Sequence, residues 1–228
     1  MKIPFSVYDF FAFLATGFIV LCAVDYAFDL GWLQKKDLPP GILVFIILGA
    51  YILGHLVANL SSYFLEHRFL RGILMSPEHT LFEETKGFWS RVFPIFYRTF
   101  PPETKKRVFA RAKTAGISQP GRGLFFHCHS IVKRDKCTAD RLRNFLNAYG
   151  FCRNASMASI ISAAILLYAG LREWDRDLDS TAGINFDKLT WAAVAIVVAI
   201  GLFYRYLKFF KHYTEEVFRD YAESASQP

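Results

Sequence analysis

The stretch GILVFIILGAYILGHLVANL, residues 41–60, contains no acidic residue, lysine or arginine. About 20 mostly apolar residues are what a helix needs to cross the hydrocarbon core of a membrane. Three more mostly apolar stretches cover residues 8–28, 155–171 and 189–207. The stretch at 155–171 is only just long enough to cross. The chain of 228 residues is 53% hydrophobic and 17% aromatic, which is more apolar than a soluble domain of this size. We predict an all-α membrane protein with four transmembrane helices.

Each apolar stretch has an alternative interpretation as a buried helix of a soluble protein, and the first also as a signal peptide. Residues 8–28 follow no strongly basic segment and contain no A-x-A cleavage site. A second long apolar stretch begins about a dozen residues later. We therefore expect the first stretch to be a retained membrane helix.

The distribution of charge predicts which side of the membrane each loop occupies. Residues 64–153 contain 17 of the 27 lysines and arginines but only 7 of the 20 acidic residues. Residues 25–40 contain 2 basic and 3 acidic residues, and residues 172–188 contain 3 basic and 5 acidic residues. Because basic loops are retained in the cytoplasm, the middle segment and both termini are predicted to be cytoplasmic.

This topology divides the chain into four parts. A transmembrane hairpin covers residues 1–63, a basic and mostly helical cytoplasmic domain covers 64–153, a second hairpin covers 154–207, and a cytoplasmic amphipathic tail covers 208–228. The domain is thus inserted between spans 2 and 3. An insert of about 80 residues is marginally stable alone, so we expect the tail to pack on it.

Within the insert, three helix starts are indicated by capping residues. Ser76 precedes Pro77, Pro102 and Glu103 open a second helix that Gly116 ends, and Thr138 opens a third. Val108, Phe109 and Ala112 form the apolar side of the second helix. The fold of residues 117–137 is left open, because their periodicity fits neither strand nor helix uniquely.

Two histidines and two cysteines lie close together in FFHCHSIVKRDKC, residues 125–137. His127, His129 and Cys137 are residue types that bind zinc, but the paired spacing of structural zinc sites is absent. In a strand the two histidines would share a face, whereas in a helix they would lie about 200° apart. We predict no metal site, no cofactor and, in the reducing cytoplasm, no disulfide.

The segment RGLFFH, Arg122 to His127, resembles the R-x4-H motif of HEPN-type ribonucleases. In that family the histidine transfers a proton and the arginine stabilises charge on the scissile phosphate. This chain has Gly123 where the family has a polar residue, and Pro120, Gly121 and Gly123 argue against an unbroken helix. A membrane-tethered ribonuclease is therefore an alternative hypothesis with Arg122 and His127 as its catalytic residues.

The second apolar stretch also carries polar side chains at helical spacing: His55, Asn59, Ser62 and Glu66. Polar groups within a membrane normally face other helices or a water-filled path. We expect this face to point inward, for hydrogen bonding between helices or, alternatively, for an ion pathway in a pore.

Small residues recur every fourth position in two of the stretches, as Ala50, Gly54 and Ala58 and as Ala155, Ser159 and Ala163. Such tracks allow close helix packing, either within one chain or between copies of it.

Clusters of basic residues give the insert a strongly positive surface. The predicted binding surface consists of Lys105, Lys106, Arg107, Arg111, Lys113, Lys133, Arg134 and Lys136. Anionic lipid is the favoured partner, since each basic residue near a membrane surface contributes ~1 kcal/mol. Nucleic acid or a nucleotide signal is the alternative partner, because Phe109 and Phe126 lie near these cations in the sequence.

Three segments together resemble a group of small, uncharacterised bacterial inner-membrane proteins that have four spans and a cytoplasmic insert. They are IPFSVYDFFAFLATGFIVL at the start, YGFCRNASMA at residues 149–158 and YRYLKFFKHYTEEVFRDY near the end. Some members of the group lie among anti-phage defence genes. The resemblance implies a multi-pass protein of the bacterial inner membrane, a homo-oligomer that acts as a sensor or effector with a cytoplasmic protein partner.

The chain contains no phosphate-binding loop, nucleophile elbow or other catalytic signature. The leading hypothesis is accordingly a non-enzymatic membrane scaffold that oligomerises and binds a partner or signal through its basic domain. The pore and the ribonuclease are the two alternatives.

Overall fold

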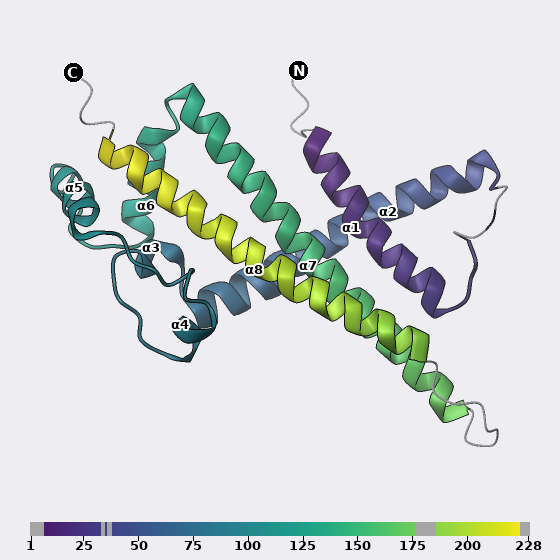
Figure 1. The fold of residues 1–228 in the computed structure, drawn as a ribbon. Coiled ribbons are helices and arrows are strands. Elements are labelled where there is room, and N and C mark those ends of the chain that lie inside the picture. Colours follow the sequence, from purple (N-terminus) through teal and green to yellow (C-terminus); the bar gives the residue numbers. More distant parts are fainter. Residues whose placement is uncertain (1–6, 33–34, 36–37, 177–185, 224–228) are drawn as a thin grey trace. The chain divides into compact units, whose positions relative to one another are not determined.

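The computed structural model describes residues 7–32, 35, 38–176 and 186–223, and every regular element within them is helical (Figure 1). The elements are α1 (Val7–Ala27), α2 (Pro40–Ser61), the π-helix η1 (Ser62–Leu74), α3 (Pro77–Thr80), α4 (Phe88–Val92), α5 (Pro102–Lys113), α6 (Arg122–Val132), α7 (Lys136–Arg176) and α8 (Phe186–Glu223). The all-α prediction is confirmed for these residues. The first six residues of the predicted N-terminal hairpin, residues 33–34 and 36–37 of its loop, residues 177–185 of the acidic loop and residues 224–228 of the tail lie outside them.

The helices form two compact units. Unit 1 comprises Met1–Leu65 and Phe151–Tyr204, and unit 2 comprises Glu66–Gly150 and Arg205–Pro228. The domain boundaries predicted after residues 63, 153 and 207 differ from these divisions by two to three residues. Both α7 and α8 contribute residues to each unit.

Among the residues that the structure describes, three helical stretches are long and apolar enough to cross a membrane. Pro40–Thr80, Lys136–Arg172 and Phe186–Glu223 have mean hydropathies of 2.3, 1.6 and 1.8 over their most apolar segments. The segment in the second stretch is 61% buried, compared with 17% in each of the other two. Ala12–Ala27 is apolar but shorter. The chain therefore has the helices of a multi-pass membrane protein, with α7 the most enclosed of the three.

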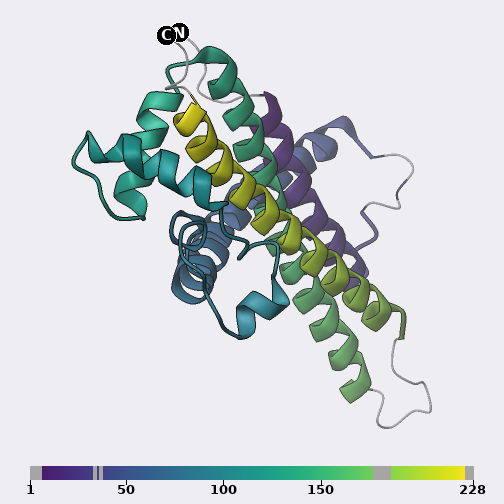
Figure 2. The same cartoon turned by 60° about the vertical axis from the view of Figure 1, so that its left-hand side comes forward.

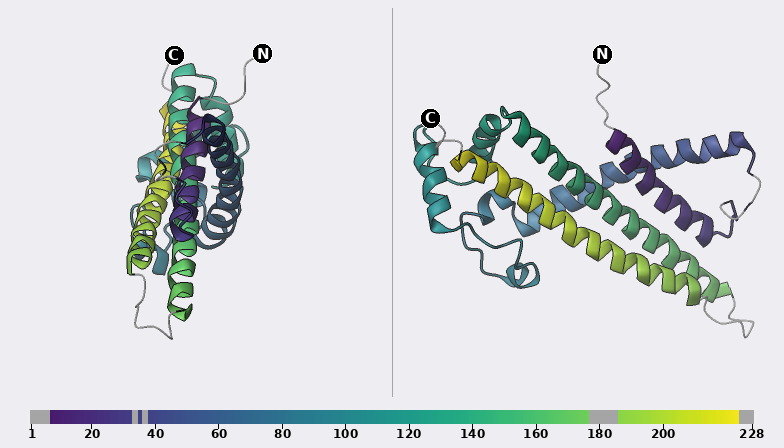
Figure 3. Two further views of the ribbon diagram at one scale, coloured as in Figure 1. Left: turned by 90° about the vertical axis from the view of Figure 1, so that its right-hand side faces the viewer. Right: turned by 45° about the horizontal axis from the view of Figure 1, so that its top comes forward.

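In unit 1, two glycines let α1 and α2 approach to backbone contact (Figure 3). A Cβ atom added to Gly54 would lie 1.9 Å from the carbonyl oxygen of Phe13. One added to Gly17 would lie 1.8 Å from the carbonyl oxygen of Ala50. No side chain tolerates such distances, so glycine is required on both helices. Two members of the first small-residue track, Ala50 and Gly54, thus pack against α1 of the same chain.

The second track is buried within unit 1, in which α7 and α8 lie side by side (Figures 1 and 2). Ala155, Ser159 and Ala163 are at most 4% exposed. The Ser156 hydroxyl donates a hydrogen bond of 2.9 Å to the carbonyl oxygen of Ala199. Small side chains at this seam let a hydroxyl of one helix reach the backbone of the next, a contact that apolar surroundings strengthen.

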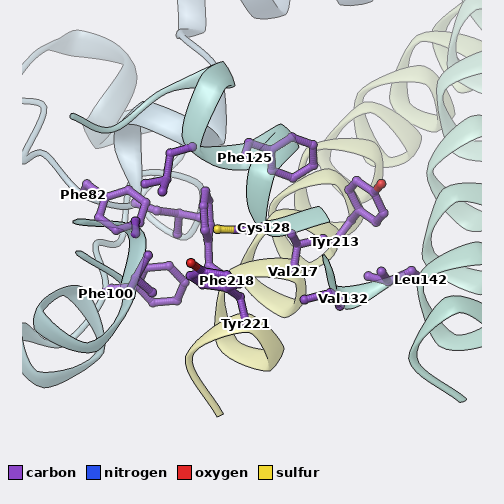
Figure 4. Close-up of a cluster of buried hydrophobic side chains, with 14 residues drawn as sticks. Phe82, Phe100, Phe125, Cys128, Val132, Leu142, Tyr213, Val217, Phe218 and Tyr221 are labelled. Carbon is purple, nitrogen blue, oxygen red and sulfur yellow. The ribbon is translucent and has the colours of Figure 1, made fainter. Parts of the chain in front are cut away.

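Unit 2 is held together by an aromatic core (Figure 4). Helix α8 contributes Tyr213, Val217, Phe218 and Tyr221, which contact side chains of α5, α6 and the segment around Phe82 and Phe100. The Phe218 ring meets the Phe82 ring edge to face at 5.0 Å, a favoured aromatic geometry. Residues 208–223 of the predicted amphipathic tail therefore supply a large part of the core of unit 2. In Figure 2 the yellow end of α8 lies beside the teal helices of this unit.

Several local predictions can be compared with the helices. Helix α5 begins at Pro102, and its Val108 and Ala112 are fully buried, as predicted. Helix α7 begins two residues before Thr138, because the Asp135 carboxylate accepts the Thr138 amide hydrogen at 2.8 Å and takes the capping role. Residues 122–132, whose fold the sequence left open, form α6.

Candidate functional site

The predicted basic surface of unit 2 is only partly available for binding. Six of its eight residues have exposed side chains: Lys106, Arg107, Lys113, Lys133, Arg134 and Lys136. The other two are used in folding. Lys105 donates a hydrogen bond of 2.8 Å to the carbonyl oxygen of Phe82, and Arg111 lies over the Tyr221 ring at 4.4 Å and donates to its carbonyl oxygen. Unit 2 therefore presents a smaller cationic surface than the sequence predicts.

A polar cavity of about 540 Å³ lies elsewhere in unit 2, between α8 and the segment that precedes α5. It is lined by Ile95, Arg98, Thr99, Phe100, Pro101, Lys211, His212, Glu215 and Arg219. None of these side chains was identified as a site residue from the sequence. They come from two segments more than a hundred residues apart, so no local motif connects them.

Lys211, on α8, forms hydrogen bonds to the other wall of this cavity. Lys211 is 2% exposed, and its ammonium donates to the carbonyl oxygens of Ile95 and Arg98, the latter at 2.7 Å. It also lies 3.5 Å from the Glu215 carboxylate, which contacts Nδ1 of His212 at 3.0 Å. Burial lowers the pKa of Lys211, which lies beyond the apolar stretch ending at residue 207, and Glu215 opposes that effect. The positive charge of Arg98 lowers the same pKa further.

The structure does not bring the two residues of the ribonuclease-like motif together. Both lie on α6, which begins directly after Pro120 and Gly121 and continues through Gly123, so the expected break is wrong at Gly123 only. Five residues along an α-helix correspond to a rotation of about 140°. The guanidinium of Arg122 lies over the Phe126 ring at 5.7 Å, and the His127 ring contacts Tyr221 at 5.7 Å. Each side chain packs on a different aromatic neighbour.

The metal candidates are likewise separated. His127 and His129 lie two residues apart on α6, on different faces of the helix, and Cys137 belongs to α7. Among the described residues, no group of three or more histidine, cysteine or acidic side chains could hold a metal ion. Cys128, between the two histidines, is fully buried in the aromatic core. Burial raises the pKa of its thiol to about 12, although Arg111 opposes the shift, which makes Cys128 unreactive while unit 2 is folded.

The predicted polar face of α2 is not a single inward face. His55 stacks on Phe13 of α1 with ring centroids 4.1 Å apart, but Asn59 is exposed. The α-helix ends at Ser61, and the π-helix that begins at Ser62 winds more residues into each turn, so the spacing that aligned the four residues does not continue. Glu66 belongs to unit 2, where it forms an ion pair with Arg71 at 2.8 Å and accepts the Tyr149 hydroxyl at 2.7 Å. The expectation that this face points inward is therefore wrong at Asn59.

The buried polar contact between α2 and α7 involves residues that the helical spacing did not single out. The Ser61 hydroxyl donates to Oδ1 of Asn154 at 2.6 Å, and both side chains are less than 5% exposed. A polar pattern along one helix gives no information on which residue of a distant helix will be its partner.

No protein-family model, curated protein or solved structure matches this chain, so the resemblance to four-span inner-membrane proteins stays a prediction.

Proposed function

We propose that the chain is an integral membrane scaffold whose basic domain, unit 2, binds an anionic partner on the cytoplasmic side. The observation that carries this proposal is the contrast between the two units. Unit 1 exposes large apolar side chains such as Phe45 (74%) and Val197 (69%), whereas unit 2 exposes lysines and arginines around its own aromatic core. An exposed apolar surface is suited to lipid, and an exposed cationic surface is suited to anions.

In this proposal α1 is a fourth span beside the three long apolar helices. Its close crossing with α2 at Gly17 and Gly54 supports that assignment, because neighbouring helices of this kind share the same apolar environment. Lys188 at the start of α8 adds a second contact. Its buried ammonium donates to the carbonyl oxygen of Ala27 at 3.1 Å and pairs with Asp29 at 2.9 Å. An ammonium at the end of a span lies at the interface, where its charge is tolerated.

The cytoplasmic placement of unit 2 is supported by charge. Residues 64–153 hold 17 basic and 7 acidic residues, while the predicted outer loops have an acidic excess. A binding role is favoured over catalysis, since Arg122 and His127 contact separate aromatic rings. A pore along α2 is not favoured either, because His55 packs on Phe13 and Asn59 is exposed.

Thiol labelling with a membrane-impermeant reagent tests the topology. Cys137 is exposed in unit 2. A variant that keeps Cys137, lacks the other three cysteines and carries Ser180→Cys has a second thiol in the predicted outer loop. In intact cells we expect labelling at residue 180 only, with Cys137 labelled after permeabilisation. Labelling of Cys137 in intact cells would overturn the orientation and with it the cytoplasmic binding role.

Light scattering of the purified protein in mild detergent, with the detergent mass subtracted, tests the homo-oligomer. The exposed apolar faces of α2 and α8 leave room for a second copy, and we expect a mass at least twice that of the 26.1 kDa chain. A mass equal to that of one chain would contradict the homo-oligomer.

A further inference from the structure

The polar cavity of unit 2 has an excess of fixed positive charge. Lys211 and Glu215 lie 3.5 Å apart and offset each other. Arg98 and Arg219 also line the cavity, their side chains are exposed, and neither guanidinium has an ion-pair partner in the part of the chain that the structure describes. An arginine stays charged at every pH at which proteins fold. Two positive charges therefore face the cavity without a compensating carboxylate.

The wall that carries Arg98 is held in place before any ligand binds. The preceding residues Phe96 and Tyr97 are buried, and the Tyr97 hydroxyl donates to the carbonyl oxygen of Leu74 at 2.7 Å. Lys211 binds the carbonyl oxygen of Arg98 itself, which ties this backbone to the helix that carries Arg219. Fixed walls lower the entropy cost of binding, as in a pre-organised site.

We propose that this cavity binds a phosphate group of a small organic phosphate, with Arg98 and Arg219 as its ligands and Lys211 as a positioning residue. The inference rests on the proposed function, of which it specifies the anionic partner. A planar guanidinium matches the oxygen geometry of phosphate and donates two parallel hydrogen bonds to it. His212 also lines the cavity, and its Nδ1 contacts the Glu215 carboxylate at 3.0 Å.

The size and the remaining lining define the class of ligand. A volume of about 540 Å³ lies within the range of roughly 300–1,000 Å³ of small-molecule sites, and exceeds what inorganic phosphate would fill. Ile95, Phe100 and Pro101 supply apolar surface on one wall. An organic group attached to the phosphate, such as a nucleoside or a glycerolipid headgroup, would contact this wall. The cavity is therefore suited to a phosphate ester rather than to the free ion.

Calorimetric titration of the full-length protein in neutral detergent tests the site, with AMP, ATP and inorganic phosphate as probes of the soluble class. Nanodiscs with and without phosphatidic acid probe the lipid class. Saturable binding of a phosphate ester by either route supports the site, and the responding probe distinguishes a soluble ligand from a headgroup. Absence of saturable binding in all arms overturns it.

Three variants that each remove one positive charge distinguish binding in the cavity from attraction by the overall positive charge of unit 2. We expect Arg98→Gln and Arg219→Gln each to weaken binding by about tenfold or more, because each removes a charged bidentate donor. Arg143→Gln, at an exposed residue of α7 that does not line the cavity, is the matched control and should leave the affinity within about twofold. Equal weakening by all three variants would overturn the site and assign binding to non-specific electrostatics. The thiol-labelling topology does not depend on these arginines, so failure of the site and failure of the proposed function can be told apart.

Discussion

The two units of this chain differ in the side chains that pack their interiors. Unit 1 buries Gly54, Ala155 and Ser159 between its helices and exposes large apolar residues, whereas unit 2 buries rings such as Phe218 and Tyr221 and exposes cations. Lipid tails are as apolar as leucine, so helices surrounded by lipid gain little from burying large side chains and associate by close packing. In water, burial of aromatic area is itself the main driving force. The composition of each interior is thus the one expected if, as proposed, unit 1 lies in lipid and unit 2 in water.

The largest effect is expected in the aromatic core of unit 2. Phe218→Ala removes a fully buried ring that contacts Phe82, Phe100 and Phe125, and should lower the free energy of unfolding of unit 2 by about 3–5 kcal/mol. The labelling rate of Cys128, in a chain whose other cysteines are replaced, reports this opening because its thiol is buried beside the ring. Phe126→Ala makes the same chemical change at a residue that is 56% exposed and should increase the rate far less. Equal rates in the two variants would show that unit 2 does not depend on this core.

In unit 1, a smaller loss of stability is expected from a change where α1 and α2 cross. Gly54→Ala places a methyl group 1.9 Å from the Phe13 carbonyl oxygen, so α1 and α2 must separate, at a cost of about 1–3 kcal/mol. Gly49→Ala is the matched control on the same helix, because its added Cβ meets no atom within 4 Å. We expect faster labelling of the buried Cys152 only in the first variant, measured in the purified protein in detergent. If Gly49→Ala is equally harmful, the loss comes from changes along α2 and not from the crossing.

The fold was more accessible from the sequence than the site. Apolar length predicts the long helices, and capping residues predict the start of α5 at Pro102, because both signals are local. The cavity depends on Lys211 meeting carbonyl oxygens of Ile95 and Arg98, which lie more than a hundred residues away and carry no side-chain signal. The requirement for Gly17 was missed for a related reason. A single glycine in an apolar stretch indicates a close contact only when the opposing backbone is known.

Two asparagines sharpen the distinction between polar groups used in packing and those that are not. Asn154 is 4% exposed and accepts the Ser61 hydroxyl at 2.6 Å, so Asn154→Leu leaves a buried donor without this partner. We expect a loss of about 1–2 kcal/mol in the stability of unit 1. Asn59→Leu alters an exposed residue on α2 and should cost nothing measurable. Thermal unfolding of both variants in detergent is the measurement, and a larger loss at Asn59 would restore the inward face that the sequence predicts.

The smallest expected effect is a pH dependence confined to unit 2. The His129 ring stacks on Phe125 with centroids 5.9 Å apart and lies near Tyr213, and burial together with the charge of Lys133 lowers its pKa below the ordinary value of 6.5. The His129 side chain therefore binds a proton more readily in the unfolded chain than in the folded one. Its contribution to the stability of unit 2 is complete above pH 6.5 and is lost as the pH falls toward the pKa of the folded state. His129→Gln should flatten the change in the thermal midpoint between pH 7.5 and 5.5, while His127→Gln on the same helix should retain it. A slope that is unchanged in His129→Gln would assign the dependence to another group. A slope that disappears in His129→Gln alone would tie the pH dependence to the aromatic core of unit 2, the same core that Phe218 dominates.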